Sequence, residues 1–99
     1  MSDEDFGFAL PPFRPDEALQ KLARELRTLG LAARGDQFEH RGQAVARASL
    51  VDGQLQAAMV KRPGRSPEWQ TRTLTQSAQL RDFVAELKKR MAAWTDRDD

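Results

Sequence analysis

The chain contains no cysteine and no tyrosine, and it has a single histidine, His40. The absence of cysteine excludes disulfides, thiolate nucleophiles and metal sites with cysteine ligands. Most pairs of a nucleophile and a general base also need histidine or tyrosine in addition to acids. We therefore expect a protein that is not an enzyme and that has no cofactor and no metal site.

Long apolar runs are also missing. No stretch approaches the roughly 20 apolar residues of a membrane-spanning helix. The acidic start of the chain lacks the basic and apolar regions of a signal peptide. These absences predict a cytoplasmic protein with no membrane interaction. With 99 residues, 39% hydrophobic and 31% charged, the chain has the composition of a single globular domain.

The net charge of +1 hides an uneven distribution along the chain. Residues 1–17 sum to −4 and residues 95–99 to −2, so residues 18–94 carry +7. A basic body with acidic ends suits an anionic partner, or ends that fold back onto the body. Solvated surface charge that maintains solubility is the simpler alternative.

The strongest local pattern lies near the end of the chain, in residues 77–94. Its apolar residues are spaced three or four apart, as on one face of an amphipathic helix, and are Leu80, Phe83, Val84, Leu87, Met91 and Trp94. If fully buried, these side chains would contribute on the order of 10 kcal/mol before the entropy cost. The pattern predicts a helix over residues 77–94.

A first helix is predicted over residues 15–29. Pro15 suits the first helical turn, and Gly30 is a typical helix stop. Four leucines repeat at spacings of three, four and three: Leu19, Leu22, Leu26 and Leu29. A coiled coil would need more than this heptad and a half, so core packing is the better interpretation.

Between the helices the apolar period shortens towards two. Asp52-Gly53 has the composition of a type I′ hairpin turn. A two-residue loop there would pair Val51 with Gln54 and Ala48 with Ala57, continuing to Ala46 with Met59. One face of this hairpin would carry small apolar residues, and the other a mixture that faces water or a partner.

Two further strands are expected, at residues 37–40 and 69–75, within a sheet spanning residues 36–75. Gly35-Asp36 is interpreted as a turn. We predict the α+β class: a helix, a four-stranded antiparallel sheet and a helix, with both helices on one face of the sheet. The expected organisation is an arm (1–14), a domain (15–94) and an acidic tail (95–99).

We expect no metal site near His40. Asp36 and Glu39 are close to it in sequence, but Glu39 and His40 would point to opposite faces of a strand. No Gly-rich phosphate loop or paired-carboxylate motif occurs in the chain.

The N-terminal arm combines acidic residues with three aromatic rings, Phe6, Phe8 and Phe13, and with Pro11-Pro12. The prolines favour an extended path. Two interpretations remain open. In the first, the arm lies along the domain with a ring in the edge of the core; in the second, it presents its rings to a partner.

A basic loop near residues 61–67 is the second candidate. Cations beside a tryptophan ring are typical of surfaces that bind nucleic acid, and the candidate residues are Arg47, Lys61, Arg62, Arg65, Trp69 and Arg72. The element order resembles, in outline, the double-stranded RNA-binding domain, although that family's Lys pair is missing from the helix starting at Ser77.

These observations predict a small binding module that is not an enzyme. The leading hypothesis is a protein–protein interaction or homodimerisation, through the open sheet face or through the arm at Phe6, Phe8 and Phe13. The alternative is nucleic-acid binding through Arg47 and the basic segment 61–72. A pattern of this kind identifies no individual partner.

Overall fold

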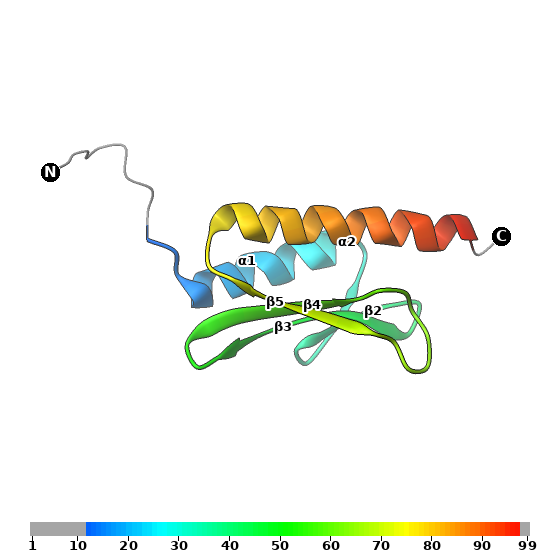
Figure 1. The fold of residues 1–99 in the computed structure, drawn as a ribbon, viewed down its shortest axis with the longest axis horizontal. Coiled ribbons are helices and arrows are strands. Elements are labelled where there is room, and N and C mark those ends of the chain that lie inside the picture. Colours follow the sequence, from blue (N-terminus) through cyan, green and yellow to red (C-terminus); the bar gives the residue numbers. More distant parts are fainter. Residues whose placement is uncertain (1–11, 98–99) are drawn as a thin grey trace, which may run out of the picture.

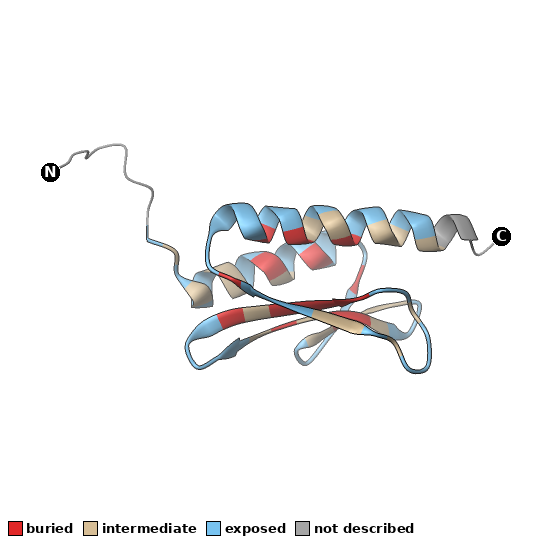
Figure 2. Cartoon of the chain, viewed as in Figure 1, coloured by how far each residue is buried: buried red, intermediate tan, exposed pale blue. Residues whose placement is uncertain are grey.

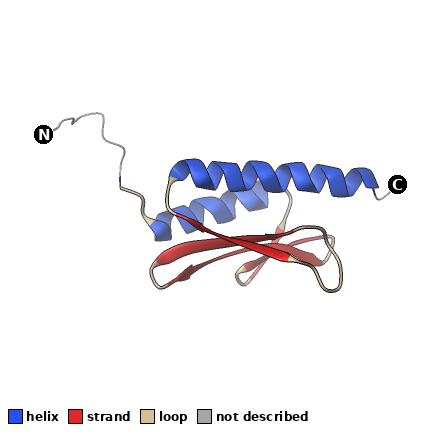
Figure 3. Cartoon of the chain, viewed as in Figure 1, coloured by secondary structure: helices blue, strands red, loops and turns tan. Residues whose placement is uncertain are grey.

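The computed structural model describes residues 12–97 of the chain. The elements are α1 (Pro15–Thr28), β1 (Ala32–Arg34), β2 (Gln37–His40), β3 (Gln43–Val51), β4 (Gln54–Val60), β5 (Trp69–Leu74) and α2 (Ser77–Arg97). The strands form one antiparallel sheet in which their spatial order is their chain order. Both helices lie on the same face of this sheet (Figures 1 and 3). The α+β prediction is confirmed.

The predicted number of strands is wrong, because the sheet has five strands rather than four. The additional strand is β1, which pairs Arg34 with Gln37 across the turn at Gly35 and Asp36. Gly35 has a φ of +63°, which glycine adopts readily. The strand was missed because three exposed residues are too few to show a period of two.

The hairpin of β3 and β4 has the predicted register. Val51 pairs with Gln54, Ala48 with Ala57, and Ala46 with Met59. Asp52 and Gly53 have φ values of +53° and +77°, as a type I′ turn requires at both central positions. The turn therefore sets which side chains of these two strands face the helices.

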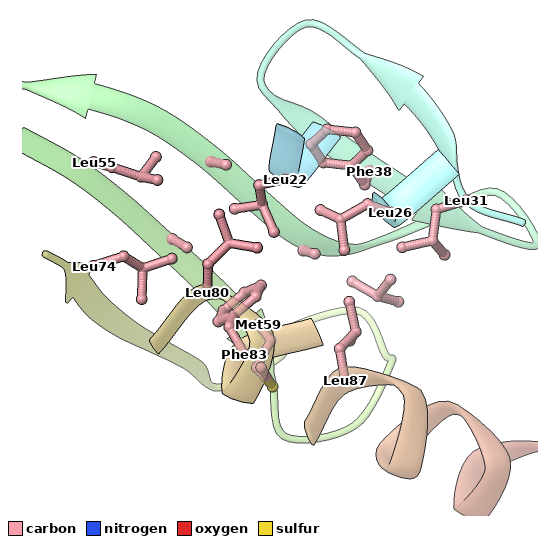
Figure 4. Close-up of a cluster of buried hydrophobic side chains, with 14 of the residues drawn as sticks. Leu22, Leu26, Leu31, Phe38, Leu55, Met59, Leu74, Leu80, Phe83 and Leu87 are labelled. Carbon is pink, nitrogen blue, oxygen red and sulfur yellow. The ribbon is translucent and has the colours of Figure 1, made fainter. Parts of the chain in front are cut away.

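The core lies between this hairpin and the two helices, and Figure 4 shows its side chains. From α1 it contains Leu22 and Leu26, and from α2 it contains Phe83 and Leu87, all four with no exposed surface. The sheet contributes large residues, among them Phe38, Leu55 and Met59, together with the small Ala46, Ala48 and Ala57. Because alanine projects little from the sheet, the helices can lie close to its backbone.

A β-bulge alters the face of β3 on which one side chain lies. Phe38 pairs with Ala46, but the next residue of β2, Glu39, pairs with Ala44. Val45 is therefore the extra residue, and it is fully buried in the core. Strict alternation would have placed Val45 on the opposite face from Ala46.

The ends of α2 are held by specific hydrogen bonds. At its start, Oε1 of Gln79 accepts hydrogen bonds from the backbone N–H groups of Thr75 (2.6 Å) and Gln76 (3.2 Å), which caps the first turn. Farther along, Arg90 donates to the carbonyl of Val60 (3.1 Å) and Trp94 to that of Lys61 (3.3 Å). These bonds attach the helix to the end of β4.

The second helix is longer than predicted, since it continues to Arg97 rather than ending at residue 94. Neither helix of residues 12–97 combines the length and apolarity needed to cross a membrane.

Candidate binding surfaces

The face of β3, β4 and β5 that points away from the helices is the first candidate surface. We call it the open face. The strand pairings assign to it Arg47, Ser49, Val51, Gln54, Gln56, Ala58, Val60, Trp69, Thr71 and Thr73. Among the described residues no helix covers this side (Figure 3). Arg47 is the one charged side chain of the set.

Burial divides the open face into two parts. Figure 2 shows how burial varies along the strands for the residues of both faces. Ala58 and Val60 are almost completely buried, at 1% and 0% exposed. Gln54, Thr71 and Thr73 are exposed, and Val51 is 40% exposed. The accessible part of the face is thus neutral and mostly polar, with amide and hydroxyl groups.

Arg47 and Trp69 lie beside the buried Ala58, whereas Val60 belongs to the core cluster. The guanidinium carbon of Arg47 lies 4.6 Å from the centre of the Trp69 ring, within the range of a cation–π contact. Arg47 pairs with Ala58, and Trp69 pairs with Val60. The two side chains therefore lie over β4 in the absence of a helix. Trp69 is half-buried and also packs against the core.

The other predicted nucleic-acid residues are brought together only in part. Lys61, Arg62 and Arg65 lie exposed on the loop that joins β4 and β5, next to Trp69 in the chain. Arg72 lies elsewhere, because it pairs with the core residue Ala57 and so shares the helix-facing side. The pKa of Glu86 on α2 is lowered chiefly by its hydrogen bond from Arg90, and the charge of Arg72 adds a smaller effect. The six residues do not form one surface.

The arm residues have different outcomes. Phe13 is half-buried and packs against the core. The placement of its ring agrees with an arm that lies along the domain at this point. Phe6 and Phe8 lie outside the described residues.

A third surface was not predicted from the sequence. The two helices run in the same direction, so both begin at the same end of the molecule (Figure 1). A groove of about 610 Å³ lies between their first turns. We call it the α1–α2 groove. The residues that line it are Pro12, Phe13, Arg14, Glu17, Ala18, Lys21, Thr75, Gln76, Ser77, Ala78, Leu80 and Arg81. In the sequence, cations occur near the starts of both helices. They come together only because the two helices run in the same direction.

The groove combines apolar and basic parts. Leu80 is 3% exposed and contributes to its apolar part together with Phe13 and Ala18. Arg14, Lys21 and Arg81 are exposed cations along it. The one acid in the lining is Glu17, which lies 3.9 Å from Arg14. The groove therefore has an excess of positive charge.

The ionisable residues form no metal centre in the described part of the chain. Between residues 12 and 97 no three His, Cys, Asp or Glu residues come together in a way that could hold a metal ion. Glu39 instead forms an ion pair with Arg34, at 3.6 Å, at the β1 edge of the sheet. At Glu86, a 2.9 Å hydrogen bond from Arg90 lowers the pKa of the carboxyl.

Comparison with known proteins gives no relative. No family model, no curated protein and no solved structure matches the chain.

Proposed function

We propose that the chain is a protein-binding module without enzymatic activity, and that its partner is a second copy of itself bound through the open face. The observation that carries this proposal is the lack of charge on that face. Of its ten residues one is charged, in a chain with 31% charged residues. The centres of protein–protein interfaces are depleted of charge in the same way.

A neutral face suits a symmetric dimer in particular. In a two-fold dimer the same patch meets itself, so a patch rich in one charge would repel its copy. The amide of Gln56 and the hydroxyls of Thr71 and Thr73 are each both donors and acceptors. Such groups can bond to their own copies. Val51, at the end of β3, adds an exposed apolar side chain.

Arg47 does not oppose this arrangement. Its guanidinium is already stacked on Trp69, and the residue is half-buried. In a dimer, each Arg47 would remain stacked on the Trp69 ring of its own chain and would not be a freely moving cation. Arg and Trp are also among the residues enriched at the energetic centres of interfaces.

Nucleic-acid binding remains the alternative, and it has less geometric support. The exposed loop cations Lys61, Arg62 and Arg65 favour it, since phosphate contacts need accessible cations. Stacking on a base would need an accessible tryptophan face, whereas Trp69 lies between Arg47 and the core. Arg72 is on the other side of the sheet.

Sedimentation equilibrium over a wide range of protein concentration tests the proposal. We expect a mass that rises from monomer to dimer. Gln56→Glu should weaken the dimer by at least about tenfold, since it places one buried carboxylate from each copy, and so two like charges, in the same two-fold interface. Gln20→Glu is the matched control, because Gln20 is exposed on α1 and outside the open face. It should leave the dimer unchanged.

A mass that stays monomeric at the highest attainable concentration overturns homodimerisation. Binding of short single- or double-stranded oligonucleotides at low salt would favour the alternative, provided that it weakens steeply with added salt and with Arg62→Ala plus Arg65→Ala. A dimer that is lost on removal of residues 1–11, but not with Gln56→Glu, would assign the interface to the arm.

A further inference from the structure

The α1–α2 groove lies where the described part of the chain begins. Pro12 and Phe13 are themselves part of its lining, and Phe13 packs against the core. The eleven residues that precede Pro12 are therefore attached at the edge of the groove. Their local concentration there is high because no separate association step is needed.

The charges of the two parts are complementary. Residues 1–11 contain three acids, Asp3, Glu4 and Asp5, and no Lys or Arg. The groove has the cations Arg14, Lys21 and Arg81 against the single acid Glu17. The first turns of both helices add the positive ends of their dipoles, which also favour carboxylates.

The apolar residues of the arm have a matching pattern. Phe6, Phe8 and Leu10 alternate with Gly7 and Ala9. In an extended backbone alternate side chains share one side, so these three would form an apolar edge. An extended chain from Pro12 to Phe6 covers about 20 Å. The groove volume of about 610 Å³ is in the range of sites that enclose a ligand larger than one side chain.

We propose that the α1–α2 groove is the docking site for the chain's own N-terminal arm, bound in cis. Phe6, Phe8 and Leu10 contact the apolar part of the groove at Ala18 and Ala78, which are half-buried and exposed, respectively. The carboxylates of residues 3–5 lie against Arg81 and Lys21. This inference is independent of homodimerisation, because the groove lies on the helices and the open face lies on the other side of the sheet.

Paramagnetic relaxation on the full-length chain tests this proposal. Because the chain has no cysteine, Ser2→Cys provides a single attachment point for a spin label. We expect loss of amide peak intensity in residues 14–21 and 75–81, relative to the same sample after reduction of the label. A label at Ser66→Cys, on the exposed loop between β4 and β5, is the control for non-specific broadening.

Variants on both sides of the contact make the test specific. Arg81→Glu should restore much of the lost intensity, while Arg24→Glu should not, since Arg24 is exposed on α1 but outside the groove. Phe6→Ser with Phe8→Ser should also restore it. Asp3→Asn, Glu4→Gln and Asp5→Asn together should make the broadening insensitive to salt. The amide spectrum of each variant shows directly whether the domain has folded.

Two results would overturn the proposal. The first is groove broadening no greater than that produced by the label at Ser66→Cys. The second is broadening that persists when isotope-labelled chains without a spin label are mixed with spin-labelled chains. That result would mean that the arm reaches a second copy rather than its own groove.

Discussion

The Arg47 guanidinium lies over the Trp69 ring at 4.6 Å and bridges the two strands on either side of β4. Between the two side chains runs the buried end of β4, with Ala58 1% exposed. The pair thus lies on the open face beside Ala58, an apolar strand residue that no helix covers. The basic residue and the aromatic ring that suggested nucleic-acid binding are in contact with each other at this position.

The first prediction concerns the stability of this contact. Arg47→Ala should lower the free energy of unfolding by about 1 kcal/mol, from the lost cation–π contact and the exposure of Ala58. Urea denaturation measures it. Arg62→Ala is the control, since Arg62 is exposed on the loop and should change stability by less than about 0.5 kcal/mol. Equal effects of the two substitutions would contradict a structural role for Arg47.

A second prediction concerns the small residues beneath the helices. Ala57→Val adds two methyl groups where Ala57 is 1% exposed, and it should destabilise the fold by about 1–3 kcal/mol. Thr73→Val creates the same residue on the exposed open face, where we expect a change within about 0.5 kcal/mol. Thermal or urea unfolding of both variants gives the comparison. A tolerated Ala57→Val would mean that the helices do not lie tightly on the sheet.

Local patterns were sufficient for the parts of the fold that depend on one segment. The stripe of Leu80, Phe83 and Leu87 identified a helix, and Asp52-Gly53 identified both a turn and the register on either side of it. They also indicated that the sheet offers mainly alanines to that helix, whereas the core contains the large strand residues Phe38, Leu55 and Met59 as well. The helix, the turn and the register were predicted correctly because the residue spacing itself encodes the face that is buried.

The remainder depended on contacts between distant segments. The bulge that turns Val45 into the core depends on how β2 meets β3, and the side on which Arg72 lies depends on the pairing of β5 with β4. The α1–α2 groove needs both helices to start at the same end of the molecule. No spacing within one segment contains that information. Proximity in the sequence therefore grouped Arg72 with Arg47 and Trp69, which lie on the opposite side of the sheet.

A third prediction compares two glycines. A methyl group added at Gly53 or at Gly64 would meet no atom within 4 Å, so neither substitution causes a clash. Gly53 has a φ of +77°, however, where a Cβ is strained. Gly53→Ala should therefore destabilise the fold by about 1–2 kcal/mol. Gly64→Ala should be neutral or stabilise by up to about 1 kcal/mol, because it restricts the unfolded chain. Urea denaturation of both variants measures the difference, and equal effects would contradict the turn conformation.

The last prediction concerns pH and the attachment of α2. Arg90 donates hydrogen bonds both to Glu86 (2.9 Å) and to the carbonyl of Val60 (3.1 Å). The bond to Glu86 lowers the pKa of its carboxyl below the usual value of 4.5. Because the pKa is lower in the folded state, the ionised carboxylate stabilises the fold above the unfolded pKa. This contribution is lost as the pH falls through the folded pKa.

Glu86→Gln should therefore flatten the acid side of the stability profile, with the largest difference from the parent chain at neutral pH and little difference at low pH. Arg90→Met should remove the same pH-dependent part and, in addition, cost about 1–2 kcal/mol at all pH values, because the carbonyl of Val60 loses its donor. Lys88→Met is the matched control, since Lys88 is exposed on the same helix and is not among the groups that lower the pKa of Glu86. Urea denaturation across the acid range measures all three. A parallel downward shift of the whole profile in Glu86→Gln would contradict the proposed ion pair, because removing a titrating group must change the slope with pH and not only the offset.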